Sequence, residues 1–249
     1  MEVFNKNLNF MFIFTNTSNS CNYKFMSSNL FSKIALLPKL IKDGKAKYLW
    51  NAFSNRLYSK EIAFGFKRDL SIPFKKPRTL KPISIREFTE ADKPFFIDNP
   101  NNGFILKFNT CYIGETKEQV PCARVWLIDS SENNKLRATW GNRFPQLKQD
   151  EVLLENVFTV PKYRGMGIIP AFLYDVAEKS KDLGAKYAIT FGEVKNINTT
   201  RSYSYAGFSP YIVRNVSYFL FIKSIKYEVV SKEYLDFYNK SINRKAVTK

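Results

Sequence analysis

The sequence of 249 residues contains no histidine. This absence excludes Ser-His-Asp triads, imidazole bases and histidine-ligated metal sites. Cysteine is scarce as well, and Cys21, Cys111 and Cys122 lack the short spacings of a zinc site. So few cysteines, odd in number, favour a reduced, cytoplasmic protein. We therefore expect no metal centre, and acid–base chemistry has to come from carboxylates, tyrosine, lysine, cysteine or water.

Long apolar runs are also missing. No stretch reaches the roughly 20 apolar residues of a transmembrane helix, and the longest N-terminal apolar patch is Phe10–Phe14. The sequence has no Gly-x-x-x-x-Gly-Lys-Ser/Thr motif, which excludes a P-loop NTPase. A dinucleotide-binding Gly-x-Gly-x-x-Gly motif would need glycine where Pro170 stands.

Acidic residues are few, and the formal net charge is +17. Residues 1–81 alone hold 15 lysines and arginines against 4 acids. One interpretation is an anionic partner such as CoA, a membrane surface or nucleic acid. The other is a compositional bias toward lysine with no functional meaning. Hydrophobic residues make up 45% of the chain and aromatic residues 16%, which indicates a packed globular protein.

The chain divides by pattern into four parts. We expect residues 1–26 to be disordered or to precede the true start, for which Met26 is a candidate. Residues 27–81 form a basic N-terminal extension and a proline-rich linker. In this part an apolar face predicts a helix from Lys45 to Ile62, which packs on the next domain or lies on an anionic membrane. Residues 82–230 form the main domain, and residues 231–249 a C-terminal helix and tail.

The segment from Thr159 to Ile168 carries the clearest functional pattern. An apolar run precedes it, helical spacing follows it, and Gly184 stands where a C-terminal cap would fall. This pattern predicts a strand, a glycine-containing turn and the start of a helix. The first N–H groups of a helix have no internal partner and attract anions. The sequence therefore predicts a phosphate site, with an ordinary tight turn as the alternative.

Two blocks of sequence resemble one known family. Pro161-Lys-Tyr-Arg-Gly-Met-Gly-Ile168 resembles the pyrophosphate-binding motif of the GNAT acetyltransferase superfamily, Arg/Gln-x-x-Gly-x-Gly/Ala. Lys162 stands at its first position, which keeps a positive charge without the planar fork of arginine. The segment Asn196–Phe208 resembles the downstream part of that family, an asparagine before a short tyrosine-bearing helix that ends in Gly-Phe. The resemblance covers about residues 83–230.

The order of expected elements agrees with this resemblance. We expect strands at Ile83–Phe88, residues 104–115, Val120–Asp129, Val152–Val160 and Tyr187–Val194, and a final hairpin of Ser209–Val216 with Ser217–Val230. Helices are expected after Thr89, after the glycine turn, over Asn196–Ala206 and over Lys232–Ile242. No assignment is made for Leu136–Gln149. The predicted fold is α/β, a GNAT-like mixed sheet flanked by helices, with a basic helical N-terminal extension.

The resemblance implies a set of residues that bind the cofactor acetyl-CoA. The backbone of the central strand would pair with the pantetheine arm and polarise the thioester carbonyl. The turn would bind the pyrophosphate, and Asn196 would bind the pantetheine or the acceptor, or else simply cap its helix. The cofactor-binding set is Val157, Phe158, Thr159, Val160, Lys162, Arg164, Gly165, Met166, Gly167, Ile168 and Asn196.

The resemblance also implies two catalytic residues. Tyr203 matches the family tyrosine that protonates the leaving thiolate, although a core aromatic ring is the alternative; Tyr205 lies nearby without that match. Glu155 on the central strand is the expected base, directly or through water, with Glu151 and Glu193 as alternatives. A covalent route through Cys111 or Cys122 is disfavoured, because nothing nearby in sequence activates either thiol.

These features predict an N-acetyltransferase that moves an acetyl group from acetyl-CoA to a primary amine by direct transfer in a ternary complex. The expected partners are CoA and a small-molecule amine acceptor, without nucleic acid and without a metal. One alternative is transfer of a longer acyl chain or transfer to a hydroxyl group. Another is a non-catalytic CoA-binding or basic nucleic-acid-binding protein, since a fold alone does not determine function.

Overall fold

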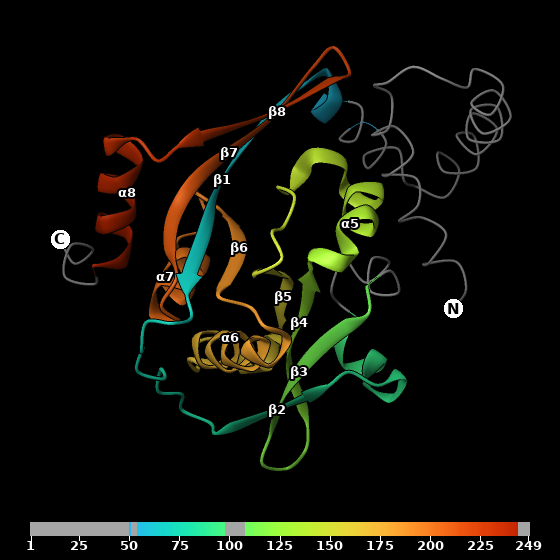
Figure 1. Cartoon of the computed structure of the whole chain (residues 1–249), viewed down its shortest axis with the longest axis vertical. Coiled ribbons are helices and arrows are strands. Elements are labelled where there is room, and N and C mark those ends of the chain that lie inside the picture. The colour runs from blue at the N-terminus through green and yellow to red at the C-terminus, as the bar shows by residue number, and fades with distance from the viewer. Residues whose placement is uncertain (1–49, 51–53, 98–107, 244–249) are drawn as a thin grey trace, which may run out of the picture. The chain divides into compact units, whose positions relative to one another are not determined.

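The computed structural model describes residue 50 and residues 54–97 and 108–243 (Figure 1). The chain divides into two compact units, which are described separately. The first comprises residues 1–61 and 216–225, and the second comprises residues 62–215 and 226–249. The predictions made above for residues 1–49, 51–53, 104–107 and 244–249 therefore lie outside the described residues.

The described residues form eight strands and several helices. The strands are β1 (Tyr58–Asp69), β2 (Ile83–Glu87), β3 (Thr110–Thr116), β4 (Pro121–Asp129), β5 (Glu151–Thr159), β6 (Tyr187–Glu193), β7 (Ser209–Phe219) and β8 (Ile222–Val229). The α-helices are α5 (Asn133–Trp140), α6 (Ile168–Lys179), α7 (Ile197–Tyr205) and α8 (Lys232–Ile242). Short 3-10 helices are η1 (Glu90–Phe96), η3 (Ser130–Glu132), η4 (Gly141–Arg143), η5 (Pro161–Tyr163) and η6 (Ser180–Leu183).

The strands form one mixed sheet in the order β2-β3-β4-β5-β6-β1-β7-β8. β5 and β6 run parallel, whereas the pairs β2–β3, β3–β4, β4–β5 and β1–β6 are antiparallel. The predicted α/β class with a mixed sheet flanked by helices is confirmed.

The helix predicted from Lys45 to Ile62 is wrong over its last five residues. Residues 54–57 are helical, but β1 begins at Tyr58 and takes a place between β6 and β7. Phe64 and Phe66 are fully buried at the period of two that a strand requires. Pairing with two neighbouring strands outweighs the local helical pattern, because tertiary context overrides intrinsic propensity. Part of the predicted extension is thus an inner strand of the sheet.

Alternation along the strands divides the buried side chains between two cores. In β4, Ala123 and Val125 belong to the core beneath α6, α7 and α8, whereas Trp126 and Ile128 belong to the core that includes Leu136 of α5. Successive strand residues point to opposite faces, so the long apolar run of β4 is buried on both sides. Helix α5 begins before the region left without an assignment and extends into it.

Helix α6 follows the glycine turn, as predicted. Ile168, Phe172 and Val176 recur at four-residue spacing and are buried. The helix ends at Lys179, continues as η6, and is capped by Gly184 at φ 79°. The predicted C-terminal cap is confirmed, one 3-10 turn beyond the end of the α-helix.

The final hairpin turns later than predicted. β7 continues through Phe219, and the turn lies at Leu220 and Phe221, with φ of 46° and 67°. A two-residue hairpin turn requires positive φ and usually contains Asn-Gly. Because neither residue occurs there, the sequence gives no signal for this turn, and the predicted break at residues 216–217 is wrong.

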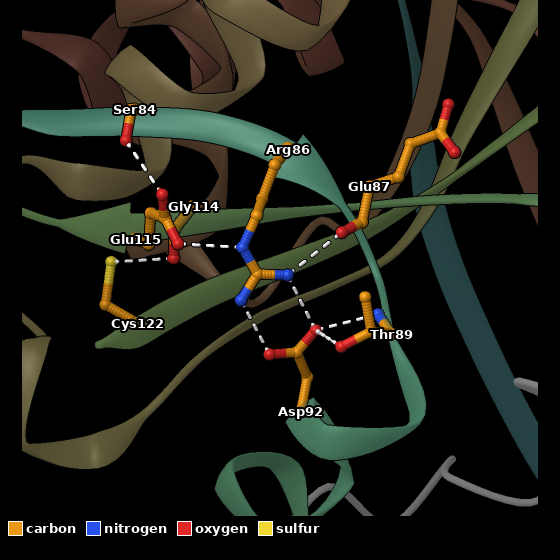
Figure 2. A network of polar contacts seen from close by, with 8 residues as sticks. All are labelled: Ser84, Arg86, Glu87, Thr89, Asp92, Gly114, Glu115 and Cys122. Atoms are coloured by element: carbon orange, nitrogen blue, oxygen red, sulfur yellow. Dashed lines mark hydrogen bonds and ion pairs between the residues drawn. The ribbon is translucent and has the colours of Figure 1, made fainter. Parts of the chain in front are cut away.

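An arginine-centred network holds η1 on the β2–β3 edge (Figure 2). Arg86 donates to both Asp92 carboxylate oxygens at 2.8 Å, and its Nε donates to Glu115 at 2.8 Å. The Thr89 N–H also donates to Asp92, which forms a capping box at the start of the helix expected after Thr89. Burial raises the pKa of Asp92, but the bonds from Arg86 and Thr89 outweigh burial and lower it below its ordinary value.

Among the described residues, no helix combines the length and apolar character needed to cross a membrane.

Candidate functional site

The two parallel strands at the centre of the sheet separate part of the way along their length. They pair only at three positions, Glu151 with Tyr187, Val152 with Ala188 and Leu153 with Ile189. β5 continues to Thr159 and β6 to Glu193, without further pairing between these described residues. The backbone of β5 therefore has an edge along which an extended ligand can pair like an added strand.

A β-bulge lies where β5 leaves β6. Arg124 of β4 pairs with Phe158 and Trp126 pairs with Glu155, so Asn156 and Val157 together oppose a single residue of β4. Asn156 has φ 56°, which only a minority of non-glycine residues adopt. A bulge bends its strand and redirects side chains, and this bulge lies among the residues predicted to bind the cofactor.

The backbone hydrogen bonds at the end of β5 show which of its N–H groups point toward the gap, the space between β5 and β6 beyond their last paired residues. The Val160 N–H donates to the Cys122 carbonyl at 2.9 Å, and the Val160 carbonyl accepts from Tyr163 at 2.9 Å. Both backbone groups of Val160 are thus engaged within the fold. Since successive N–H groups of a strand point to opposite sides, that of Thr159 points toward the gap between β5 and β6.

The turn after β5 exposes a glycine with open space around it. Gly165 has φ 78°, and an added Cβ would meet nothing within 4 Å. Lys162 and Arg164 beside it are exposed. The N–H groups of Met166 and Gly167 have no backbone acceptor within the described part of the chain. Exposed cations and free N–H groups at a helix start can bind a phosphate.

Gly167, unlike Gly165, lies against another segment of the backbone. Residues 78–81, here named the strap, cross the turn: Leu80 N–H and Thr79 Oγ1 both donate to the Met166 carbonyl, at 2.9 and 3.0 Å. A Cβ on Gly167 would lie 3.0 Å from the Arg78 carbonyl oxygen. Glycine at this position is therefore needed for the approach of the strap. Ile168 is buried in the core, so only its backbone can reach a ligand.

The strap adds cations to the turn. Lys81 Nζ lies 5.9 Å from the centre of the Tyr163 ring, and Lys162 Nζ lies 4.8 Å from the same ring. Arg78 and Lys81 are both exposed. The sequence analysis placed this segment in a linker and did not predict that it lies against the glycine turn. The cluster of lysines and arginines in the segment is the feature that could have suggested a place beside a phosphate site.

Tyr203 and Glu155 come from different elements and are close enough to interact. Burial raises the pKa of the Tyr203 phenol above its usual range, the Thr190 hydroxyl lowers it, and the negative charge of Glu155 raises it again. Tyr203 is 5% exposed, and its ring packs edge-on against Phe66 at 5.3 Å. It is thus a core aromatic whose protonated hydroxyl lies near β5 and β6. Tyr205 is 39% exposed.

The alternative bases lie in different settings. Glu151 is buried at the paired end of β5, where it accepts from Lys67 Nζ at 2.8 Å and from the Lys148 N–H at 3.1 Å. This carboxylate is held in an ion pair away from the gap. Glu193 is exposed at the end of β6, and Glu155 is half-buried at the bulge.

Asn196 caps helix α7, because its Oδ1 accepts from the Thr199 N–H at 3.1 Å. It also lines a cavity of about 570 Å³. The other lining residues are Glu193, Lys195, Ile197, Asn198 and Arg201. The capping role and a role in ligand contact are therefore compatible.

Neither described cysteine is set up as a nucleophile. Burial raises the pKa of the Cys111 thiol to about 12 and that of Cys122 to about 11. Both thiols therefore stay protonated at neutral pH, which makes them poor nucleophiles. Cys21 lies outside the described residues. No cluster of His, Cys, Asp or Glu within the described ranges has the arrangement of a metal site.

Arg124 was not singled out from the sequence. It is fully buried on β4, its guanidinium lies 5.1 Å from the centre of the Phe96 ring, and burial lowers its pKa to about 10. Its strand partner is Phe158 at the bulge. Arg124 is the one charged residue in the otherwise apolar run Pro121–Ile128. This feature could have marked it in the sequence as a buried charge.

The chain is similar to several solved structures. One is described as an acetyltransferase of the GNAT family from Novosphingobium aromaticivorans, with 15% identity, a TM-score of 0.45 and 64% of each chain covered. Another is a GNAT acetyltransferase from Colwellia psychrerythraea, with 12% identity, a TM-score of 0.44, and 74% of this chain and 62% of that chain covered. A third is a glucosamine N-acetyltransferase region of a fungal β-N-acetylglucosaminidase, with 13% identity, a TM-score of 0.46 and coverages of 69% and 22%.

The matched region spans less than two thirds of each of these three solved chains. No family model and no curated protein matches the sequence. The descriptions of these structures indicate no subfamily. Since every TM-score is below 0.5, the reaction has to be judged from the residues of this chain.

Proposed function

We propose that this protein transfers an acetyl group from acetyl-CoA to a primary amine in a ternary complex. The separation of β5 from β6 beside an open, cationic glycine turn carries this proposal. An extended arm fits the part of β5 that does not pair with β6, and a phosphate group fits the turn next to it. CoA combines these two features in one molecule.

The pyrophosphate of CoA would be held by the N–H groups of Met166 and Gly167 and by the side chains of Lys162 and Arg164. The pantetheine arm would run along residues 155–159, with Asn196 as a further contact. The Thr159 N–H, directed toward the gap, would donate to the thioester carbonyl oxygen and stabilise negative charge that develops there.

Glu155 would accept a proton from the amine, directly or through water, so that a neutral nitrogen attacks the carbonyl carbon. A C–N bond forms, the C–S bond breaks and the electron pair leaves with sulfur, and the attacking nitrogen gives its second proton to water or to the departing thiolate. The raised pKa of Tyr203 keeps its proton in place. Transfer of this proton to a thiolate of pKa about 8.5 is unfavourable. We therefore assign Tyr203 as a hydrogen-bond donor that stabilises the departing thiolate.

Binding of CoA tests the first part of this proposal. A ligand that binds only the folded state raises the unfolding temperature in a concentration-dependent way. We expect CoA to do so, and acetyl-CoA with an amine to release free thiol. A longer acyl chain or a hydroxyl acceptor would be identified by thiol release from other acyl-CoA and acceptor pairs. Absence of any CoA effect on thermal unfolding contradicts the proposal.

A further inference from the structure

The cavity of about 570 Å³ lies where β6 ends and α7 begins. Its volume is within the range of small-molecule sites, about 300–1,000 Å³. Five of its six lining residues have charged or amide side chains, and Ile197 is the apolar one. This lining suits a small polar ligand, because charged and amide groups bind polar atoms and disfavour an apolar surface.

The cavity and the glycine turn are at the same edge of the sheet. β5 and β6 run parallel, so their carboxyl ends share one edge, and open α/β sheets bind ligands outside these ends. The glycine turn follows β5, whereas the cavity begins with Glu193, the last residue of β6. The proposed function assigns the turn to the phosphates of CoA and the gap to its pantetheine arm. The cavity on the β6 side is therefore left for the second substrate.

The charged side chains of the cavity are one acid, Glu193, and two cations, Lys195 and Arg201. Arg201 is anchored, because its Nε donates to the Ser241 carbonyl near the end of α8 at 2.6 Å. Its two terminal NH2 groups have no partner among the described residues, and the side chains of Glu193 and Lys195 have none there either. A guanidinium presents its N–H groups as a planar fork that matches a carboxylate or a phosphate. The C-terminal helix thus positions a cation for an anionic ligand group.

We propose that this cavity binds the acceptor and selects amines that also carry an anionic group, a carboxylate or a phosphate. Lys195 and Arg201 bind the anion. Glu193, at the border of the gap, attracts the positively charged form of the amine before it loses its proton. An acceptor with a neutral or positive far end leaves both cations without a partner. The inference rests on the proposed acetyl transfer and adds to it the class of acceptor and the residues that select it.

Matched acceptors test the need for an anion. ω-Amino acids of increasing length are compared with their own amides, which keep the amine and the chain but lose the charge. Aminoalkyl phosphates are compared with the amino alcohols in the same way. We expect kcat/KM of the full-length protein to be at least about 10-fold higher for the best anionic acceptor than for its uncharged counterpart, the sum of two partly exposed ion pairs. The series with the larger ratio identifies carboxylate or phosphate as the group that the cavity takes.

Two variants assign this preference to the cavity. Lys195→Gln and Arg201→Gln should each lower the ratio of anionic to uncharged acceptor at least about 3-fold. The intrinsic reactivity of each amine is the same for every variant, so a change in the ratio isolates the side chain. Lys232→Gln removes an exposed cation at the start of α8, outside the cavity, and should leave the ratio unchanged. Arg201→Gln also removes the bond to Ser241, whereas Lys195→Gln breaks no side-chain bond within the described residues.

Calorimetry without a reaction separates this inference from the proposed transfer. The ω-amino acids, the aminoalkyl phosphates and their uncharged counterparts are titrated into the protein loaded with CoA. Tighter binding of the anionic compounds that weakens in both variants supports the cavity even if no thiol is released, in which case the transfer alone fails. Equal affinity and equal kcat/KM for charged and uncharged acceptors of every length would overturn the acceptor class and leave the transfer intact. A preference that is unchanged in both variants would overturn the assignment to this cavity.

Discussion

The Tyr203 phenol on α7 lies within electrostatic reach of the Glu155 carboxylate on β5. Burial is the larger cause of the raised pKa of Tyr203, and the charge of Glu155 adds to it. Tyr205, two residues further along the same helix, is exposed. The two tyrosines, only two residues apart in the sequence, therefore differ in burial. Tyr203 is placed to interact with Glu155.

Tyr203→Phe should lower kcat while the ring keeps its packing. Loss of one hydrogen-bond donor to a developing charge typically reduces the rate by about 100-fold to 1,000-fold. The affinity for CoA should change little, because the bond strengthens only in the transition state. Steady-state kinetics and CoA titration measure the two effects. Tyr205→Phe is the matched control, and equal turnover by both variants would remove Tyr203 from the mechanism.

Glu155→Gln should give a rate defect that depends on pH. A base is needed most when the acceptor amine is protonated, so the defect should be largest at low pH and shrink as pH rises. The measurement is kcat/KM for the parent and the variant from pH 6 to pH 9. A rate loss of the same size across that range would argue against Glu155 as the base.

Lys162→Ala and Arg164→Ala should each weaken CoA binding. Loss of one charge-assisted bond to phosphate corresponds to about 1.4 kcal/mol, or roughly 10-fold in Kd. Isothermal titration calorimetry provides the measurement. Lys148→Ala, an exposed cation near the opposite end of β5, is the control and should bind CoA like the parent. Unchanged affinity in both turn variants would place the pyrophosphate elsewhere.

The two glycines of the turn should respond differently to alanine. Both have positive φ, so each variant carries backbone strain of about 1 kcal/mol. Gly167→Ala also brings Cβ to 3.0 Å from the strap backbone and should therefore destabilise the fold further. Gly165→Ala meets open space, and its main effect should be on CoA affinity. Urea unfolding of the two variants compares their stabilities; a less stable Gly165→Ala would contradict the role of the strap.

Asp92→Asn should destabilise the protein at neutral pH by about 1–3 kcal/mol, because it removes the charged acceptor of Arg86. The pKa of Asp92 is lowered in the folded state. Its contribution to stability is therefore present above the unfolded pKa of about 3.9 and is lost as pH falls through the lower folded pKa.

Urea unfolding at pH 7 and near pH 3 should show the difference between the parent and Asp92→Asn shrinking at the lower pH. Glu90→Gln, at an exposed carboxylate in the same 3-10 helix, should have little effect at either pH. A stability difference that does not change with pH would contradict the assignment of the charged network.

Much of the site could be predicted because its signals are local. Gly165 and Gly167 identify the turn, and the helical spacing after them identifies α6, without knowledge of the rest of the chain. The capping pattern at Thr89 and the Asn196 cap are local as well. These elements depend on residues within about one helical turn of each other.

What could not be predicted depends on distant contacts. β1 is a strand because β6 and β7 pair with it, although the predicted helix extended over its first five residues, Tyr58–Ile62. The strap acquires its role from Met166, which lies far along the chain. The buried Arg124 carries only a weak signal, since a charge in a strand can equally face solvent.

The most direct test of the proposed acetyl transfer combines thiol release with the mass of the acceptor. The full-length protein is incubated with acetyl-CoA and a panel of primary amines, and free CoA thiol and acetylated amine are measured together. We predict amine-dependent thiol release that matches the acetylated product one for one and that falls at least about 100-fold in Tyr203→Phe. Thiol release that is independent of every amine, or absent from a protein that binds CoA, would contradict this account.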